Sequence, residues 1–178
     1  RIAIKKIIQQ RLLEIPTNTE ERKLKKADFI EELRSSPIAL STQQANEQHY
    51  EVPPLFFQEI MGSHLKYSCG WFDENTTSLN AAEKNMLELY VERLGVQNHQ
   101  RVLDLGCGWG SFTLFAAEKF PDSNFVAVSN SKDQIEFIKN TAKARSLSNI
   151  QAIKQDMNDL SLKGSFDRII SIEMFEHM

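Results

Sequence analysis

The stretch "LDLGCGWGSF", residues 103–112, decides how this chain folds. Its apolar start is typical of a buried strand, and it runs without a linker into three alternating glycines, Gly106, Gly108 and Gly110. Glycine lets the main chain turn sharply and approach a ligand closely at the start of a helix. The stretch therefore predicts a strand, a tight turn and a helix, with a ligand site at the turn.

Strands and helices alternate from Arg101 onward. The expected elements are a strand in "RVLDLG", a helix that reaches Phe120, a strand in "NFVAVS", a helix from Ser131 to about Arg145, and strands in "IQAIKQ" and "FDRIISIE". Such alternation is typical of βαβ units with a parallel sheet. We therefore expect an α/β fold with a doubly wound, Rossmann-like sheet.

A complete sheet of this type has more than four strands. With the last residue at Met178, the apolar segment "RIISI" would form a bare sheet edge, which is a pairing hazard. We therefore expect the sheet to be truncated after the fourth strand, with later strands and much of the acceptor pocket outside this sequence.

The part before the sheet is expected to form a cap, residues 1–79, and the cofactor-binding core is expected at 80–178. Helices are predicted up to Ile15, from a cap at Asn18 with Glu21, from Pro54 to Gly62, and from Asn80 with Glu83 to Gly95. Residues 41–80 are rich in aromatic side chains: Tyr50, Phe56, Phe57, Tyr67, Trp71 and Phe72. These suit cation–π walls, the lining of an acyl-chain site, or a plain hydrophobic cover.

The glycine spacing separates two classes of ligand. A dinucleotide fingerprint is G-x-G-x-x-G, whereas this turn is G-x-G-x-G with Asp104 two residues before the first glycine. That pattern is typical of S-adenosylmethionine-dependent methyltransferases, and an acid near the turn offsets the ammonium group of this ligand. The alternative is a structural tight turn in an α/β protein.

Polar side chains after the second and third strands are candidates for the rest of this ligand. No acid directly follows the second strand, so Asn130 and Gln134 are the polar candidates for the ribose. Gln134 also fits a capping box with Ser131, and the residues alone leave both roles open. After the third strand, Asp156 can accept from an adenine amino group while Met157 packs on the ring.

Four stretches, "YSCGWF", "LDLGCGWGSF", "SNSKDQ" and "FDRIISIEMFEHM", follow one another in an order that resembles the cyclopropane-fatty-acid synthase superfamily of S-adenosylmethionine-dependent methyltransferases. Within it, "SPIAL", "ANEQHYEVP" and "LKYSCG" are most similar to the coclaurine N-methyltransferase-like branch. The resemblance covers most of residues 34–178. It implies a class I methyltransferase sheet with an N-terminal helical extension.

The resemblance also implies which residues hold the cofactor, S-adenosyl-L-methionine. Two residues of the N-terminal segment would close over it, Tyr67 and Ser68. The methionine part would lie against the turn, formed by Asp104, Gly106, Cys107, Gly108 and Gly110. The ribose would face Ser129, Asn130 and Gln134, and the adenine would face Asp156 and Met157.

The end of the chain carries the expected catalytic groups. The resemblance implies that Glu173, Glu176 and His177 are active-site residues of the N-methyltransferases, whereas the synthases share "FEH" but generally carry glycine in place of Glu173. The synthases also hold a bicarbonate, partly through residues matching Cys69 and Glu176. A protonated amine must be attracted and then deprotonated, which suits paired carboxylates with a histidine or glutamate as base. Glu173 therefore favours methyl transfer to an amine nitrogen of a small molecule.

Two other functions stay open at this point. One is cyclopropane-fatty-acyl-phospholipid synthase-type methylene transfer to an unsaturated acyl chain, and the other is a non-catalytic cofactor-binding or scaffold protein. The expected partner is accordingly a small-molecule amine or a lipid acyl chain, and a homodimer is an open alternative.

Composition bounds the remaining classes. The 178 residues carry a net charge of −3, which gives no reason to expect nucleic acid as a partner. Cys69 and Cys107 suit a reducing compartment, and two cysteines with four scattered histidines predict no metal site. No apolar run approaches the roughly 20 residues of a membrane helix. We expect a cytoplasmic protein without stable membrane insertion; residues 1–36, with nine Lys/Arg and six Asp/Glu, fit a solvated helical arm or a membrane-surface role.

Overall fold

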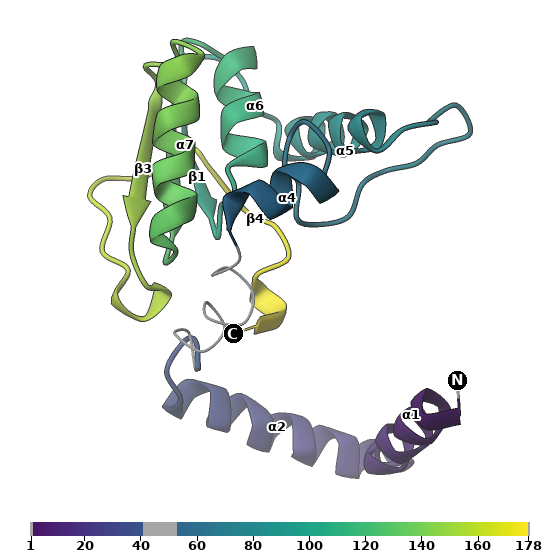
Figure 1. The fold of residues 1–178 in the computed structure, drawn as a ribbon. Coiled ribbons are helices and arrows are strands. Elements are labelled where there is room, and N and C mark those ends of the chain that lie inside the picture. Colours follow the sequence, from purple (N-terminus) through teal and green to yellow (C-terminus); the bar gives the residue numbers. More distant parts are fainter. Residues whose placement is uncertain (1, 41–52, 178) are drawn as a thin grey trace. The chain divides into compact units, whose positions relative to one another are not determined.

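The computed structural model describes residues 2–40 and 53–177, without the side chains of Ile2 and His177. The chain divides into two compact units, Arg1–Ile38 and Ala39–Met178 (Figure 1). The first unit is helical and the second contains the sheet. The boundary between 1–79 and 80–178 that the sequence suggests separates a cap from a cofactor-binding core, not two compact units. It stays a prediction.

The sheet has four parallel strands in the order β3-β2-β1-β4. Their bounds are β1 Arg101–Leu105, β2 Asn124–Ser129, β3 Ile150–Lys154 and β4 Arg168–Ser171. β1 pairs with β2 on one side and with β4 on the other, so β4 is an edge strand in the described part of the chain. The parallel α/β fold expected from the alternating pattern is confirmed.

β4 is shorter than the stretch "FDRIISIE" suggested. At its start, the Asp167 carboxylate accepts the Arg101 backbone N–H at 2.7 Å, a donor that a ladder carbonyl would otherwise use. Past its end, Glu173 has a φ of +50°, which is incompatible with extended backbone. These two features limit the regular strand to Arg168–Ser171.

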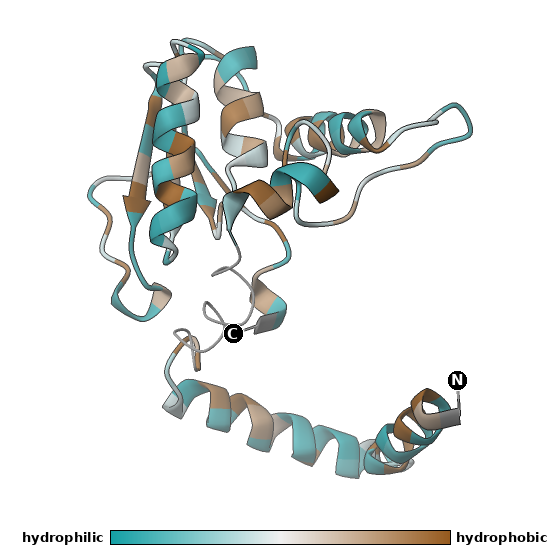
Figure 2. Cartoon of the chain, viewed as in Figure 1, coloured by the Kyte–Doolittle hydropathy of each residue, from teal (hydrophilic) through white to brown (hydrophobic). Residues whose placement is uncertain are grey.

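Three helices cover one face of the sheet: α5 Leu79–Leu94, α6 Ser111–Lys119 and α7 Lys132–Ala144. Val102 and Phe125 are register partners and point to this face, where they pack with Leu87 of α5 and Phe112 of α6. Further along, α7 packs Ile138 in a cluster with Ala127 and Ala152. Hydrophobic and hydrophilic residues alternate along α7, as expected for a half-buried helix (Figure 2).

The other face is covered without a long helix in the described part of the chain. Leu103, Val126 and Val128 point to this face and are at most 4% exposed. The short 3-10 helix η1, Met157–Asp159, and the segment after it pack on them. The partly buried hydrophobic residues of this layer are Leu105, Ile153, Met157, Leu160, Leu162 and Phe166.

Helix α5 begins at a different residue from the one expected. Its N-cap is Ser78, whose hydroxyl accepts the Ala81 N–H at 3.2 Å. Asn80 and Glu83, read from the sequence as a capping pair, instead turn toward the loop that follows helix α4, Pro54–Ile60. Glu83 is 1% exposed and accepts the backbone N–H groups of Gly62 at 2.8 Å and of His64 at 3.0 Å.

This loop leads directly into the segment that meets the sheet. Phe57 of α4 and Leu65 are buried with Trp109 of the glycine turn, and the Phe57 and Trp109 ring centroids lie 5.1 Å apart. A Cβ at Gly62 would lie 2.6 Å from the Glu83 carboxylate, so only glycine fits there. Glu83 therefore fixes where the segment after Gly62 crosses the end of the sheet.

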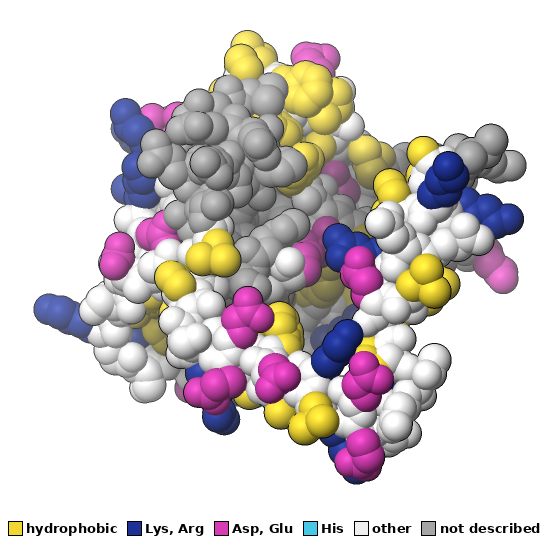
Figure 3. All heavy atoms as spheres, turned by 90° about the horizontal axis from the view of Figure 1, so that it is seen from below, with side chains coloured by type: hydrophobic (Ala, Val, Ile, Leu, Met, Phe, Trp, Pro, Cys, Tyr) yellow, Lys and Arg dark blue, Asp and Glu magenta, His cyan; other side chains and the backbone are white. Residues whose placement is uncertain are grey.

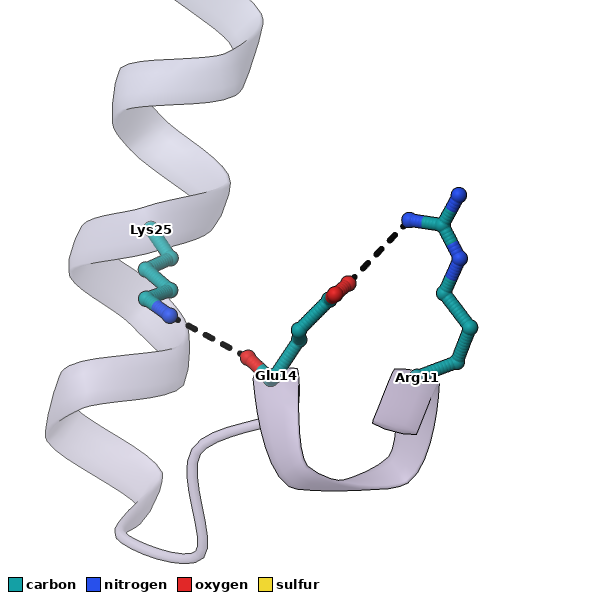
Figure 4. A network of polar contacts seen from close by, with 3 residues as sticks. All are labelled: Arg11, Glu14 and Lys25. Atoms are coloured by element: carbon teal, nitrogen blue, oxygen red, sulfur yellow. Dashed lines mark hydrogen bonds and ion pairs between the residues drawn. The ribbon is translucent and has the colours of Figure 1, made fainter. Parts of the chain in front are cut away.

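The N-terminal unit consists of α1, Ile2–Glu14, and α2, Thr19–Ser35. Asn18 caps α2 as expected, since its side chain accepts the Glu20 N–H at 2.8 Å. Lys25 donates to the Glu14 backbone carbonyl and Arg11 pairs with the Glu14 carboxylate, each at 3.1 Å (Figure 4). Such exposed pairs contribute little to stability.

The apolar stripe of α1 stays exposed. Ile4, Ile7, Ile8 and Leu12 follow helical spacing, and each is more than half exposed. On the face drawn in Figure 3, the hydrophobic, basic and acidic side chains of the described residues are interspersed, and no large region of them carries charges of one sign alone. The solvated-arm and membrane-surface roles of this unit therefore both stay predictions.

The first testable prediction concerns Glu83. Glu83→Ala leaves the buried N–H of Gly62 and the partly buried N–H of His64 without an acceptor, and we expect it to lower the free energy of unfolding by ~2–4 kcal/mol. Glu88→Ala, on the solvent side of the same helix, removes an exposed ion pair with Lys119 and should cost less than ~1 kcal/mol. Urea denaturation measures both changes. Equal losses in the two variants would contradict the role of Glu83 in holding the loop.

Candidate active site

A cleft lies at the carboxyl ends of β1 and β4, where the segment after Gly62 meets the glycine turn. It holds about 500 Å³, including space open to solvent. Eight of the residues predicted as site residues line it: Tyr67, Ser68, Asp104, Gly106, Cys107, Gly108, Gln134 and Glu173. Parallel sheets generally bind ligands beyond the carboxyl ends of their strands, and this cleft follows that rule.

The glycine turn is anchored to the neighbouring strand by one carbonyl. The backbone N–H groups of Gly106 and Cys107 both donate to the carbonyl oxygen of Val128 in β2, at 3.0 Å each. At Gly108, φ is +53° and an added Cβ would meet no atom within 4 Å, so this position faces open space. The turn thus presents bare backbone to the cleft.

At the other two glycines, protein atoms fill the space that a Cβ would take. A Cβ at Gly106 would lie 2.5 Å from the Met174 sulfur, and one at Gly110 would lie 2.6 Å from Ile138. Gly110 is the N-cap of α6 and does not line the cleft. The sequence pattern predicts that all three glycines allow a ligand to approach the backbone. In the structure, the space beside the Cα is open at Gly108 alone of the three.

Asp104 is an acid held in an apolar setting at the end of β1. It is 2% exposed, and its Oδ2 accepts from the Thr113 hydroxyl at 2.7 Å. Burial raises the pKa of Asp104 to about 6, and the hydrogen bonds from Thr113 oppose this effect. A cation bound in the cleft would stabilise the ionised form, so the site suits an ammonium group.

The residues after β2 form a small network that leaves one donor unused. The Ser129 hydroxyl donates to Gln134 Oε1 at 2.7 Å and accepts the Ser131 N–H at 3.1 Å. Ser131 caps α7 by accepting the Gln134 N–H, as the capping pattern indicated, but the Gln134 side chain bonds to Ser129 instead of completing the box. Gln134 is 3% exposed, and its Nε2 has no partner in the described part of the chain.

The residues predicted to contact adenine have contacts within the protein. Asp156 caps η1 by accepting the Asn158 N–H at 2.9 Å, and Met157 packs in the layer on the far face of the sheet. Neither lines the cleft, and the same is true of Ser129 and Asn130. Their contact with the cofactor stays a prediction.

The N-terminal segment supplies the opposite wall. Leu65, Tyr67 and Ser68 line the cleft, and Tyr67 packs edge-on against Phe57 at 5.4 Å between centroids. Among the aromatics of residues 41–80, Phe57 is buried, whereas four others are 45–58% exposed: Phe56, Tyr67, Trp71 and Phe72. Tyr50 lies outside the described residues. The plain hydrophobic cover is therefore formed by Phe57, with most of the other rings exposed.

The end of β4 brings one of the three expected catalytic groups to the cleft. Glu173 lines the cleft, and its Oε1 accepts the Cys69 backbone N–H at 2.9 Å. This hydrogen bond lowers the pKa of Glu173, with a smaller contribution from Lys66. Glu176, on the 3-10 helix η2 (Phe175–His177), is exposed and does not line the cleft. The side chain of His177 lies outside the described residues.

Five lining residues were not predicted as site residues: Leu65, Trp109, Ser111, Phe112 and Ile172. Trp109, Ser111 and Phe112 belong to the glycine motif itself, so their spacing gave a usable signal. The indole Nε1 of Trp109 is buried without a partner in the described part of the chain. Leu65 and Ile172 carried no signal beyond their places beside Tyr67 and Glu173.

Comparison with known proteins agrees with this geometry. Residues 39–178 match the model of the family described as mycolic acid cyclopropane synthetase. The chain belongs to this family. It is 40% identical over 159 residues to (S)-coclaurine N-methyltransferase of Thalictrum flavum subsp. glaucum, covering 89% of this chain and 44% of that protein. The cyclopropane-fatty-acyl-phospholipid synthase of Escherichia coli is 29% identical, with 74% of this chain and 33% of the synthase covered.

Solved structures show the same fold. A coclaurine N-methyltransferase bound to N-methylheliamine and SAH has a TM-score of 0.91 and 37% identity, covering 99% of this chain and 51% of that one. A mycolic acid cyclopropane synthase complexed with SAH and CTAB has a TM-score of 0.66 and 29% identity, covering 73% of this chain and 45% of that one. The class I methyltransferase fold and the resemblance to the coclaurine N-methyltransferase-like branch are thus confirmed. The chain spans about half the length of these relatives.

No helix among the described residues is long and apolar enough to cross a membrane. Within residues 2–40 and 53–177, no group of three His, Cys, Asp or Glu side chains is placed to hold a metal ion.

The second prediction follows from the raised pKa of Asp104. Between the unfolded pKa near 4 and the folded value of about 6, the native state binds more protons than the unfolded state. Asp104 therefore costs stability as the pH rises through this window, by ~3 kcal/mol in total. We expect wild-type protein to lose that much stability relative to Asp104→Asn between about pH 3 and about pH 7 in urea denaturation, with most of the loss between the two pKa values.

Asp122→Asn, at an exposed turn, is the matched control for loss of a carboxylate. A stability difference between wild type and Asp104→Asn that is flat across the window would show that Asp104 ionises normally in the folded protein.

Proposed function

We propose that the protein to which this chain belongs is an S-adenosylmethionine-dependent methyltransferase that transfers a methyl group to an amine nitrogen of a small molecule. The observation that carries the proposal is the placement of Glu173 in the same cleft as the glycine turn and Asp104. The relatives support it, since coclaurine and pavine N-methyltransferases match 89% and 96% of the chain.

The cleft fits S-adenosylmethionine by the chemistry of its walls. The bare backbone at Gly108 accepts close approach, and the buried Asp104 suits the ammonium of the methionine part. The unused Nε2 donor of Gln134 suits a ribose hydroxyl, because a buried amide donor without a partner is costly unless a ligand completes it. When bound, the cofactor supplies a methyl group on a sulfonium sulfur.

The chain's own residues then act on the acceptor. In the transfer, a C–S bond breaks, an N–C bond forms, and the amine nitrogen loses one proton. The lowered pKa of Glu173 keeps it ionised near neutral pH, which suits attraction of a protonated amine better than removal of its proton. We therefore assign cation binding to Glu173 and propose Glu176 or His177 as the group that accepts the proton.

Several finer assignments belong to the same proposal. Tyr67, Ser68 and the turn residues are proposed to hold the cofactor, with Ser129 and Asn130 behind the ribose and Asp156 and Met157 near the adenine. A cytoplasmic location, a homodimer and the absence of a structural metal are retained as predictions about the whole protein.

The third prediction separates amine methylation from lipid modification. Both reactions add one CH₂ to the acceptor, so product mass does not distinguish them. We expect the full-length protein, incubated with S-adenosylmethionine labelled with ¹³C in its methyl group, to place the label on nitrogen of an isoquinoline amine. NMR reads the position of the label, and an unsaturated phospholipid is the competing acceptor. A labelled ring carbon on the acyl chain would refute the proposal.

The fourth prediction concerns Glu173→Gly. Glycine relieves the left-handed φ of +50° while the hydrogen bond to Cys69 is lost, so we expect the free energy of unfolding to change by less than ~1 kcal/mol. Methyl transfer should nevertheless fall by ~100-fold or more in kcat/KM, because a protonated amine is no longer attracted. Glu136→Gln, on the exposed side of α7, is the control for loss of a carboxylate. Glutamine is used there because glycine would destabilise the helix. Full activity in Glu173→Gly would remove this residue from the mechanism.

A further inference from the structure

Lys66 places a buried cation beside the cleft. The residue is 4% exposed and directly precedes Tyr67 and Ser68. Its Nζ donates to the Ser68 hydroxyl and to the Tyr90 hydroxyl at 3.4 Å, and it lies 4.9 Å from the centroid of the Tyr90 ring. In the described part of the chain, no carboxylate forms an ion pair with it.

A buried ammonium without a carboxylate partner is expensive to keep. Burial lowers the pKa of Lys66, while the groups nearby that favour its charge are Cys69, Glu173 and Glu83. The fold thus retains a cation at a place where packing alone would be served better by an apolar side chain. A second charge, supplied by a ligand, would offset this cost.

The hydrogen bond to Ser68 has a defined direction. An ammonium has only donors, so the Ser68 oxygen must accept from Lys66. The Ser68 O–H is then directed away from Lys66. Because Ser68 lines the cleft, its hydroxyl is available there as a donor with a positive charge behind it.

We propose that Lys66 is a positioning residue: it sets the Ser68 hydroxyl to donate to the carboxylate of the cofactor's methionine part. The inference rests on the proposed function. In S-adenosylmethionine the sulfonium and ammonium groups are cations and the adenine and ribose are neutral, so the carboxylate is its one anion. Asp104 and Glu173 are acids in the wall that are suited to cations, whereas Ser68, with Lys66 behind it, is the part of the wall suited to an anion.

The test compares two ligands in the full-length protein. Lys66→Met keeps a long unbranched side chain, one atom shorter than lysine, and removes its charge. We expect S-adenosylhomocysteine to bind at least ~10-fold more weakly to this variant in isothermal titration calorimetry, as for loss of a hydrogen bond to a charged group. 5′-Methylthioadenosine, which lacks the amino acid part, should bind within ~2-fold of its wild-type affinity, and this unchanged affinity also shows that the variant is folded. Lys139→Met, on the exposed side of α7, is the matched control.

A double variant tests whether Lys66 acts through Ser68. In a Ser68→Ala background, Lys66→Met should cause little further loss of S-adenosylhomocysteine affinity, because coupled residues are not additive. Additive losses would show that Lys66 acts by itself and would overturn the positioning role.

The remaining outcomes are distinct. Equal weakening of both ligands would mean that Lys66 is a structural residue, and unchanged S-adenosylhomocysteine affinity would refute the inference. A change confined to the acceptor KM or kcat would place Lys66 with Glu173 and would also overturn it. If wild-type protein bound neither ligand, the proposed function itself would fail.

Discussion

The cleft depends on the carbonyl oxygen of Val128. Two successive N–H groups of the glycine turn converge on it, which fixes the turn to the second strand before any side chain contributes. Because the turn then leads into α6, the same anchor sets where α6 begins, and where Trp109 packs against Phe57. A shift of this turn would move both walls of the cleft at once.

The buried charged residues around this anchor have two roles: one stabilises a loop of the protein, and two are suited to bind a charged ligand. Glu83 satisfies two N–H groups of the loop that leads into the cleft, so its charge is used by the protein. Asp104 and Lys66 are buried with neutral hydrogen-bond partners, Thr113 for the acid and Ser68 and Tyr90 for the amine. Their unbalanced charges of opposite sign match the ammonium and carboxylate that an amino acid part carries. The buried charges of the fold and the charges of the proposed ligand are thus complementary.

The sequence predicted the fold well because its signals were local. Alternating strands and helices, the cap at Ser131 and the left-handed end of α5 at Gly95 all depend on residues near one another in the chain. The errors came from contacts across the chain. Asn80 and Glu83 have the spacing of a capping pair, but their side-chain oxygens accept backbone N–H groups of a loop about 20 residues earlier instead.

The site was predicted in part for the same reason. Residues of the glycine motif were found from their spacing, and Glu173 from resemblance. Asp156 and Met157 are predicted to face the adenine from their position after β3; in the structure Asp156 caps η1 and Met157 packs on the far face of the sheet, and their contact with the cofactor stays a prediction. Lys66 carries no signal in the sequence because a lysine is expected to be solvated, whereas the structure buries it.

Met174 rests where a side chain at Gly106 would be, directly after Glu173 in the chain. The turn proposed to hold the methionine part of the cofactor therefore packs against the segment that carries Glu173. A larger side chain at position 106 would therefore displace the segment that carries Glu173. If the proposed function holds, a change of acceptor at this segment would have to preserve its packing on the turn.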